Sequence, residues 1–81
     1  MLDTELRERV NAIFRDVFDD ESIVIFDAMT AQDVEDWDSL THVNLIVAAE
    51  KAFAVKFSTK EIQSLSNVGE FIGLIRRKLP G

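Results

Sequence analysis

The most apolar stretch of this chain has the periodicity of an α-helix and carries more apolar surface than one core face needs. It begins near Asp38 or Ser39 and runs to about Phe53. Its apolar residues form two stripes on roughly opposite sides of the helix, with Leu45, Ile46, Ala49 and Phe53 in the first and Leu40, Val43 and Val47 in the second. A small domain can hardly bury both stripes, so the second one needs its own explanation.

The second stripe is rimmed by the polar residues Asn44, Glu50 and Lys51. An exposed apolar stripe with a polar rim is typical of a helix that docks into the groove of a partner. The alternative is that the long acidic segment before Asp38 folds back over the stripe. The pattern favours docking over this alternative.

Two further helices are expected before and after this one. Near the N-terminus, apolar residues recur at helical spacing with Asp3 or Thr4 available as the N-cap; these residues are Leu6, Val10, Ile13, Phe14, Val17 and Phe18. Farther along the chain, the residues from Ser58 to Glu61 match a capping box. The capping box predicts a short helix that ends near Leu65.

A fourth helix is expected to open at Asn67, where Glu70 follows with the spacing of a second cap. Its apolar side consists of Val68, Phe71, Ile72, Ile75 and Leu79. Arg76, Arg77 and Lys78 lie in its last turn, where cations complement the helix dipole, and Pro80-Gly81 is expected to end it.

The expected fold class is all-α, a small antiparallel four-helix bundle with three longer helices, one short helix and a long first loop. In that loop, Ile23 to Phe26 form a short extended run without a pairing partner, which indicates a loop packed on the core rather than a sheet. The chain has 81 residues, one proline and three glycines, and it shows no obvious linker. Residues 1–81 are therefore expected to form a single domain.

The composition excludes several classes of function. The absence of cysteine excludes disulfides and thiolate metal sites, and no calcium-binding loop pattern is present. A domain of this size has little room for a deep enzyme cleft. The net charge of −6 argues against binding of nucleic acid. The first ten residues lack the apolar region of a signal peptide, and no segment has transmembrane length, so we expect a cytoplasmic monomer without membrane insertion.

Acidic residues are concentrated before the apolar helix. Between residues 16 and 38 the chain has nine Asp or Glu residues and no Lys or Arg. Such a field suits a partner with a basic docking patch. The alternative is a solvated loop that aids solubility, and charge alone does not separate the two interpretations.

The tripeptide Asp38-Ser39-Leu40, which opens the apolar helix, also allows two interpretations. Either the serine only caps the helix, in which case the protein is an acidic helical adaptor without a prosthetic group, or the serine is the attachment point of such a group. A hydrolase built from Asp38, Ser39 and His42 is disfavoured, because adjacent Asp38 and Ser39 do not supply an aligned triad and no Gly-x-Ser-x-Gly motif exists.

The sequence around this tripeptide resembles the acyl carrier protein family. The matching residues are Asp38-Ser39-Leu40, Val43, Leu45 to Ala48, Glu50 and Phe53, and they continue with Phe57, Glu61, Leu65 and Val68. In that family an Asp-Ser-Leu motif opens the second helix of a four-helix bundle, and its serine carries 4′-phosphopantetheine. The resemblance implies that Ser39 receives this group from coenzyme A, with Asp38 and Leu40 completing the motif that a phosphopantetheinyl transferase reads.

The physical chemistry of a helix N-terminus agrees with this resemblance. Asp38 is the better N-cap, which leaves Ser39 at the first helical position with its hydroxyl free. Free N–H groups and the positive end of the helix dipole favour a phosphodiester anion there. The resemblance implies a non-catalytic carrier of acyl thioesters in fatty-acid, polyketide or related biosynthesis. Its implied partners are the transferase, an acyl-loading ligase or acyltransferase, and synthase-type enzymes with basic docking patches.

The resemblance also implies roles for two sets of residues. The partner-facing set is Leu40, Val43, Asn44, Val47, Glu50 and Lys51. The second set comprises core positions that are also candidates for lining an acyl-binding cleft, namely Leu45, Ala49, Phe53, Phe57, Leu65 and Val68. For the second set, a plain core role is the main expectation.

Several positions depart from the family pattern. Asn44, Lys51 and Lys60 stand where acidic residues are common in carriers of fatty-acid synthesis. We therefore hypothesise a specialised, free-standing carrier whose partners differ from those of housekeeping fatty-acid synthesis. Trp37 replaces the usual small residue before the motif, and it is interpreted as a hydrophobic plug in preference to a shield for the prosthetic arm. His42 is interpreted as an ordinary surface residue in preference to a contact with the phosphate.

Overall fold

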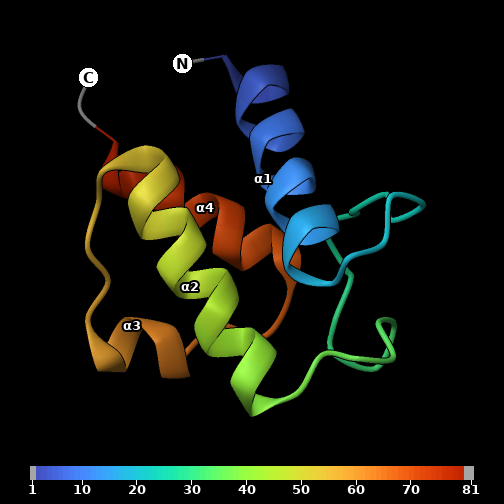
Figure 1. Cartoon of the computed structure of the whole chain (residues 1–81). Helices are drawn as coiled ribbons and strands as arrows, with labels where there is room; N and C mark the ends of the chain where they lie inside the picture. The colour runs from blue at the N-terminus through green and yellow to red at the C-terminus, as the bar shows by residue number, and fades with distance from the viewer. Residues whose placement is uncertain (1, 80–81) are drawn as a thin grey trace.

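The computed structural model describes residues 2–79, and within that range the secondary structure is helical, with no strand (Figure 1). The four helices are α1 (Asp3–Val17), α2 (Ser39–Phe53), α3 (Thr59–Gln63) and α4 (Val68–Lys78). Helices α1 and α2 contact each other and run in opposite directions, and α4 also packs on α1. The predicted all-α bundle of three longer helices and one short helix is confirmed.

The core is formed by one apolar side from each of the three longer helices. Its helical members are Leu6, Val10 and Phe14 from α1, Leu45, Ile46, Ala49 and Phe53 from α2, and Val68, Phe71, Ile72 and Ile75 from α4. The first apolar stripe predicted for α2 is thus the stripe that the fold buries. Phe18, Met29 and Val55, from the segments between the helices, complete the buried cluster.

Helices α2, α3 and α4 begin where their caps were predicted. The side chains of Asp38, Ser58 and Asn67 each accept a hydrogen bond from a backbone N–H in the first turn. The cap of α4 is not reciprocal, because the Glu70 carboxylate accepts from the N–H of Ser66 at 2.9 Å rather than from that of Asn67. Helix α3 ends at Gln63, slightly before the predicted end near Leu65.

The predicted N-cap of α1 is wrong. The helix already includes Asp3, and its N-cap is Leu2, which makes no side-chain capping bond. The Asp3 carboxylate instead accepts a hydrogen bond from Nε of Arg7 at 2.8 Å and pairs with Arg76 of α4. An acidic residue in the first turn also complements the helix dipole, so Asp3 stabilises α1 without capping it. The predicted stop at Pro80-Gly81 lies outside the described residues.

The extended run after α1 packs on the bundle as predicted. Ile23 and Ile25 are partly buried against the core. The amide side chain of Asn11 holds both, since it donates to the Ile23 carbonyl at 3.2 Å and accepts from the Ile25 N–H at 2.8 Å. The intervening Val24 and the following Phe26 remain 70% and 50% exposed. The run is therefore anchored through its backbone and alternate side chains, as a strand without a partner would be.

The next part of this loop is bound to the first turn of α4. The N–H groups of Val68 and Gly69 donate to the carbonyl oxygens of Met29 and Asp27, each at 2.9 Å. Two of the N–H groups that a helix leaves unpaired at its start are thereby satisfied by the loop. No helix in residues 2–79 combines the length and apolarity needed to cross a membrane.

Candidate functional site

The N-terminus of α2 is closed by a reciprocal pair of hydrogen bonds between Asp38 and Thr41. Oδ1 of Asp38 accepts from the Thr41 N–H at 3.0 Å, and the Thr41 hydroxyl accepts from the Asp38 N–H at 2.8 Å. The first of these bonds favours the charged carboxylate and lowers the pKa of Asp38 below its usual value. Asp38 is therefore the N-cap, as predicted, and threonine takes the place that glutamate has in most capping boxes.

Ser39 is the first residue of α2 and is exposed. Within residues 2–79, no hydrogen bond holds its hydroxyl, because Asp38 and Thr41 satisfy the cap between them. The first turn of α2 also contains no acidic residue, so the acidic group that complements the positive end of the helix dipole is the Asp38 cap. An accessible hydroxyl at such a position fits the attachment of an anionic group through a phosphodiester bond.

The second apolar stripe of α2 faces solvent along its length. Leu40, Val43 and Val47 are 70%, 57% and 40% exposed, and the rim residues Asn44 and Lys51 are exposed beside them. The alternative that the acidic loop covers this stripe is therefore wrong. Hydrogen bonds instead join the loop to Asn11 of α1 and to the first turn of α4.

Glu50 lies at the end of this stripe and has a structural contact of its own. Its side chain is half-buried, and Oε2 accepts a hydrogen bond from the N–H of Phe57 at 2.9 Å. The carboxylate thus joins α2 to the connection that leads into α3. Among the charged residues on this part of α2, Lys51 is the one whose side chain extends freely into solvent.

Trp37 packs on α1 as the predicted plug. Its ring meets Phe14 edge-on, with 5.4 Å between ring centroids, and lies 6.1 Å from that of Phe18. Aromatic pairs in this range contribute favourable contact beyond the burial of area. The plug fixes the last residues of the loop directly before the Asp38 cap, so the entry into α2 has a defined position.

His42 is not the ordinary surface residue that the sequence favoured. It is half-buried, its ring is nearly parallel to that of Trp37 at 6.1 Å, and its Nδ1 accepts a hydrogen bond of 3.2 Å from Nε1 of Trp37. The sequence did not indicate this pairing, because the two residues face each other only once the loop has turned into α2. The hydrogen bond occupies Nδ1 of the imidazole.

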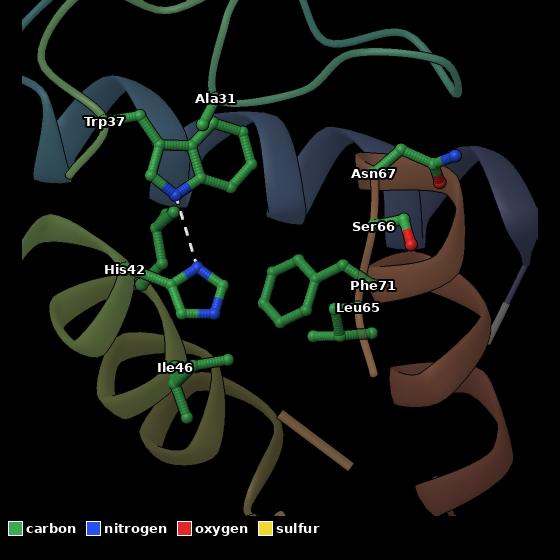
Figure 2. Close-up of a pocket in the computed structure, with 9 residues that line it drawn as sticks. Ala31, Trp37, His42, Ile46, Leu65, Ser66, Asn67 and Phe71 are labelled. Atoms are coloured by element: carbon green, nitrogen blue, oxygen red, sulfur yellow. Dashed lines mark hydrogen bonds between the residues drawn. The ribbon is translucent and has the colours of Figure 1, made fainter. Parts of the chain in front are cut away.

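A pocket of about 170 Å³ opens next to this pair, between α2 and the connection from α3 to α4 (Figure 2). Its lining residues are Ala31, Trp37, His42, Leu45, Ile46, Leu65, Ser66, Asn67 and Phe71. The walls are mostly apolar, with His42, Ser66 and Asn67 as the polar contributors. Because His42 lies one helical turn after Ser39, the pocket opens on the same part of α2 as the candidate attachment residue.

The structure brings together only part of the cleft that the resemblance implied. Of the six candidate residues, Leu45 and Leu65 line the pocket. Ala49, Phe53 and Val68 are buried in the core, and Phe57 packs partly buried against it. The sequence analysis missed Trp37, His42, Ile46 and Phe71 as lining residues. The spacing of His42 and Ile46, which follow Ser39 by three and seven residues on one helix, was a signal that could have identified two of them.

The structure is similar to the solution NMR structure of a holo acyl carrier protein from Geobacter metallireducens. The TM-score is 0.86 and the sequence identity is 44% over 90% of this chain and 84% of that chain. No protein-family model and no curated protein matches the sequence.

Proposed function

This chain belongs to the acyl carrier protein family, and from this relationship we propose that it carries acyl groups as thioesters on a 4′-phosphopantetheine arm attached to Ser39. The relationship implies a non-catalytic carrier rather than an enzyme. We further propose that residues 1–81 act as one carrier domain. The observation that supports the attachment site best is the exposed hydroxyl of Ser39 at the start of a helix whose cap is provided by other residues.

The residues around Ser39 have separate tasks in this proposal. Asp38 caps α2 and leaves the Ser39 hydroxyl free to form the phosphodiester bond. Leu40, exposed beside it, completes the motif that a phosphopantetheinyl transferase reads. When bound, the arm supplies a terminal thiol that holds the acyl group as a thioester. The helix N-terminus then lies next to the phosphodiester, where its dipole stabilises the negative charge.

The exposed stripe of α2 is the proposed docking surface for the transferase and for the enzymes that load and process the acyl group. We assign it Leu40, Val43, Asn44, Val47, Glu50 and Lys51. The apolar members supply contact area, since exposed apolar groups are what a partner groove can bury. Acidic residues in the preceding loop, including Glu35 and Asp36, supply charge that attracts basic docking patches.

We propose that the partners differ from those of housekeeping fatty-acid synthesis. Two features of α2 support this: its first turn has no acidic residue, and the Glu50 carboxylate is engaged by the Phe57 N–H. The exposed charge on the docking side of α2 is thus Lys51, so α2 itself offers a basic docking patch little attraction. Turnover by the housekeeping synthase enzymes equal to that of the main carrier of the same cell would contradict this proposal.

The attachment is tested by co-expression with a phosphopantetheinyl transferase and measurement of the intact mass. We expect a gain of one phosphopantetheine in the wild type, no gain in Ser39→Ala, and an unchanged gain in the control Ser22→Ala, which removes another exposed serine hydroxyl. An unmodified wild type with several transferases would favour the second candidate function, an acidic helical adaptor that binds other proteins without a prosthetic group.

A further inference from the structure

We infer that the pocket beside Trp37 and His42 selects the cargo: it takes a short acyl group, of about six carbon atoms, that carries a second oxygen acceptor besides the thioester carbonyl and receives a hydrogen bond there from Nε2–H of His42. This inference rests on the proposed function, because the acyl group is one that the arm on Ser39 would deliver. It adds a chemical class of cargo and a residue that reads it.

The volume of the pocket sets the length of the cargo. An apolar cavity of roughly 150 Å³ holds one benzene molecule, which has six carbon atoms. The present pocket measures about 170 Å³, so it has room for a group of similar size. Two of its walls, Leu45 and Phe71, belong to the buried core and are each 5% exposed or less. A longer chain would have to displace packed core side chains or remain in solvent.

The hydrogen bond from Trp37 determines what His42 presents to the pocket. An indole N–H is only a donor, so the Nδ1 atom that receives it carries no proton. We assign the proton of the neutral ring to Nε2 on this ground. Figure 2 shows the second ring nitrogen of His42 pointing away from Trp37 toward the side of the pocket that holds Phe71 and Leu65.

This second nitrogen is free to bind a ligand. Among residues 2–79, no side chain or backbone group forms a hydrogen bond with Nε2. In the same range, every buried side-chain nitrogen or oxygen has a hydrogen-bond partner. Nε2 must therefore be accessible rather than sealed in the core. It is a hydrogen-bond donor next to the apolar walls formed by Ile46, Leu65 and Phe71. Such a donor favours an acyl group with an oxygen acceptor on its chain over one whose chain beyond the thioester carbonyl is entirely hydrocarbon.

The inference can be tested with soluble thioesters that do not need the arm. The probes are the N-acetylcysteamine thioesters of 3-hydroxyhexanoate, hexanoate and decanoate, titrated into unmodified protein and followed by the NMR signals of the Trp37 Nε1–H and the His42 ring. We expect the 3-hydroxyhexanoyl probe to bind about 3- to 10-fold more tightly than the hexanoyl probe, the range that one hydrogen bond provides. Equal affinity of these two probes would overturn the role of His42.

Chain length is tested by the third probe. Each additional buried methylene strengthens binding roughly fourfold, so a pocket that accommodated ten carbon atoms would bind decanoate far more tightly than hexanoate. We expect the two affinities to agree within about fourfold, because the extra methylenes stay outside. A decanoyl affinity more than 50-fold higher, on the order of three buried methylenes, would overturn the size limit.

Two variants separate recognition from folding. His42→Phe keeps an aromatic ring beside Trp37 and removes the donor, so the two six-carbon probes should bind equally; a preserved preference would contradict the inference. Leu65→Phe fills the pocket from a half-buried position and should weaken both probes at least tenfold while the Trp37–His42 signals persist. Unchanged binding to this variant would place the probes elsewhere on the protein.

The same titrations on Ser39→Ala keep this inference distinct from the proposed function. The pocket does not include Ser39, so the affinities should match those of the wild type. If the probes bind as expected and the wild type never gains a prosthetic group, the proposed attachment fails and the pocket stands. If the wild type is modified but the probes do not bind, the attachment stands and the pocket inference fails.

Discussion

The indole of Trp37 donates a hydrogen bond of 3.2 Å to Nδ1 of His42. The bond joins the end of the acidic loop to the first turns of α2, and the packing of Trp37 on Phe14 ties both to α1. One contact thus connects the segment before the candidate attachment residue with the segment after it. It also orients the imidazole that lines the pocket.

Removal of the Trp37 N–H should lower the stability of the protein modestly and allow the His42 imidazole to change its tautomer. Trp37→Phe keeps an aromatic ring on Phe14 and Phe18 but deletes the N–H, so we expect the free energy of unfolding to fall by about 0.5–1.5 kcal/mol in urea denaturation. The ¹⁵N shifts of His42 should then report a mixture of tautomers. A double-mutant cycle with His42→Phe provides the control, and a coupling energy near zero would contradict the bond.

The cap at Asp38 should make stability depend on pH in the acid range. The Thr41 N–H holds the pKa of Asp38 below its ordinary 3.8. The folded state therefore binds this proton less readily than the unfolded state, and the contribution of the carboxylate is present above the ordinary pKa and lost as the pH falls through the lowered one. Asparagine caps equally well without titrating. Asp38→Asn should thus flatten the decline of the melting temperature between about pH 5 and pH 2.

The control for this measurement is Asp36→Asn, which removes a nearby carboxylate that makes no capping bond to α2. Its melting temperature should decline with acid as that of the wild type does. An identical decline in Asp38→Asn and the wild type would show that the cap carries no pH dependence.

The two glycines of α4 should respond oppositely to alanine. A Cβ at Gly69 would lie 3.1 Å from both the carbonyl oxygen and the Cβ of Asp27, so Gly69→Ala should push the loop off the helix and cost about 1–3 kcal/mol of unfolding free energy. Nothing lies within 4 Å of a Cβ at Gly73, so Gly73→Ala should gain about 0.5–1 kcal/mol through helix propensity. Equal effects of the two changes, measured in urea, would refute the close approach of the loop.

The C-cap of α2 should be improved by glycine. Ala54 has φ 55°, in the left-handed region that alanine disfavours. Ala54→Gly should raise the free energy of unfolding by about 0.5–1 kcal/mol, because glycine adopts this conformation without the Cβ clash. Asp19, with φ 51°, is the comparison, since aspartate tolerates the region better and Asp19→Gly should gain less. A loss of stability in Ala54→Gly would contradict the expectation.

The docking surface can be examined by adding a charge to the stripe. Leu40 and Val24 are both 70% exposed, but only Leu40 lies on the proposed docking side of α2. Leu40→Asp should lower the kcat/KM of phosphopantetheine transfer about tenfold or more, as the loss of a central apolar contact does at interfaces. Val24→Asp should leave it unchanged. Similar losses in both variants would indicate a general effect of negative charge rather than docking through α2.

The helices and most of their caps could be predicted because these signals are local. The capping bonds of Asp38, Ser58 and Asn67 each join residues three apart in the chain. The N-cap of α1 was mispredicted in part because one partner of Asp3 is distant. Asp3 is engaged by Arg7, four residues later, and by Arg76, which lies at the other end of the sequence and which no local pattern reveals.

The sequence by itself determined the all-α class, the start of α2 at Asp38-Ser39 and the two apolar stripes of that helix, since all of these follow from spacing along one helix. Only the tertiary structure decided that the second stripe stays uncovered, because that depends on where the acidic loop is anchored, and it is anchored by Asn11 and the first turn of α4. The tertiary structure also decided that His42 turns its free nitrogen into a pocket. That orientation depends on Trp37, whose own position is set by packing against Phe14 of α1 and Phe18, the residue directly after α1.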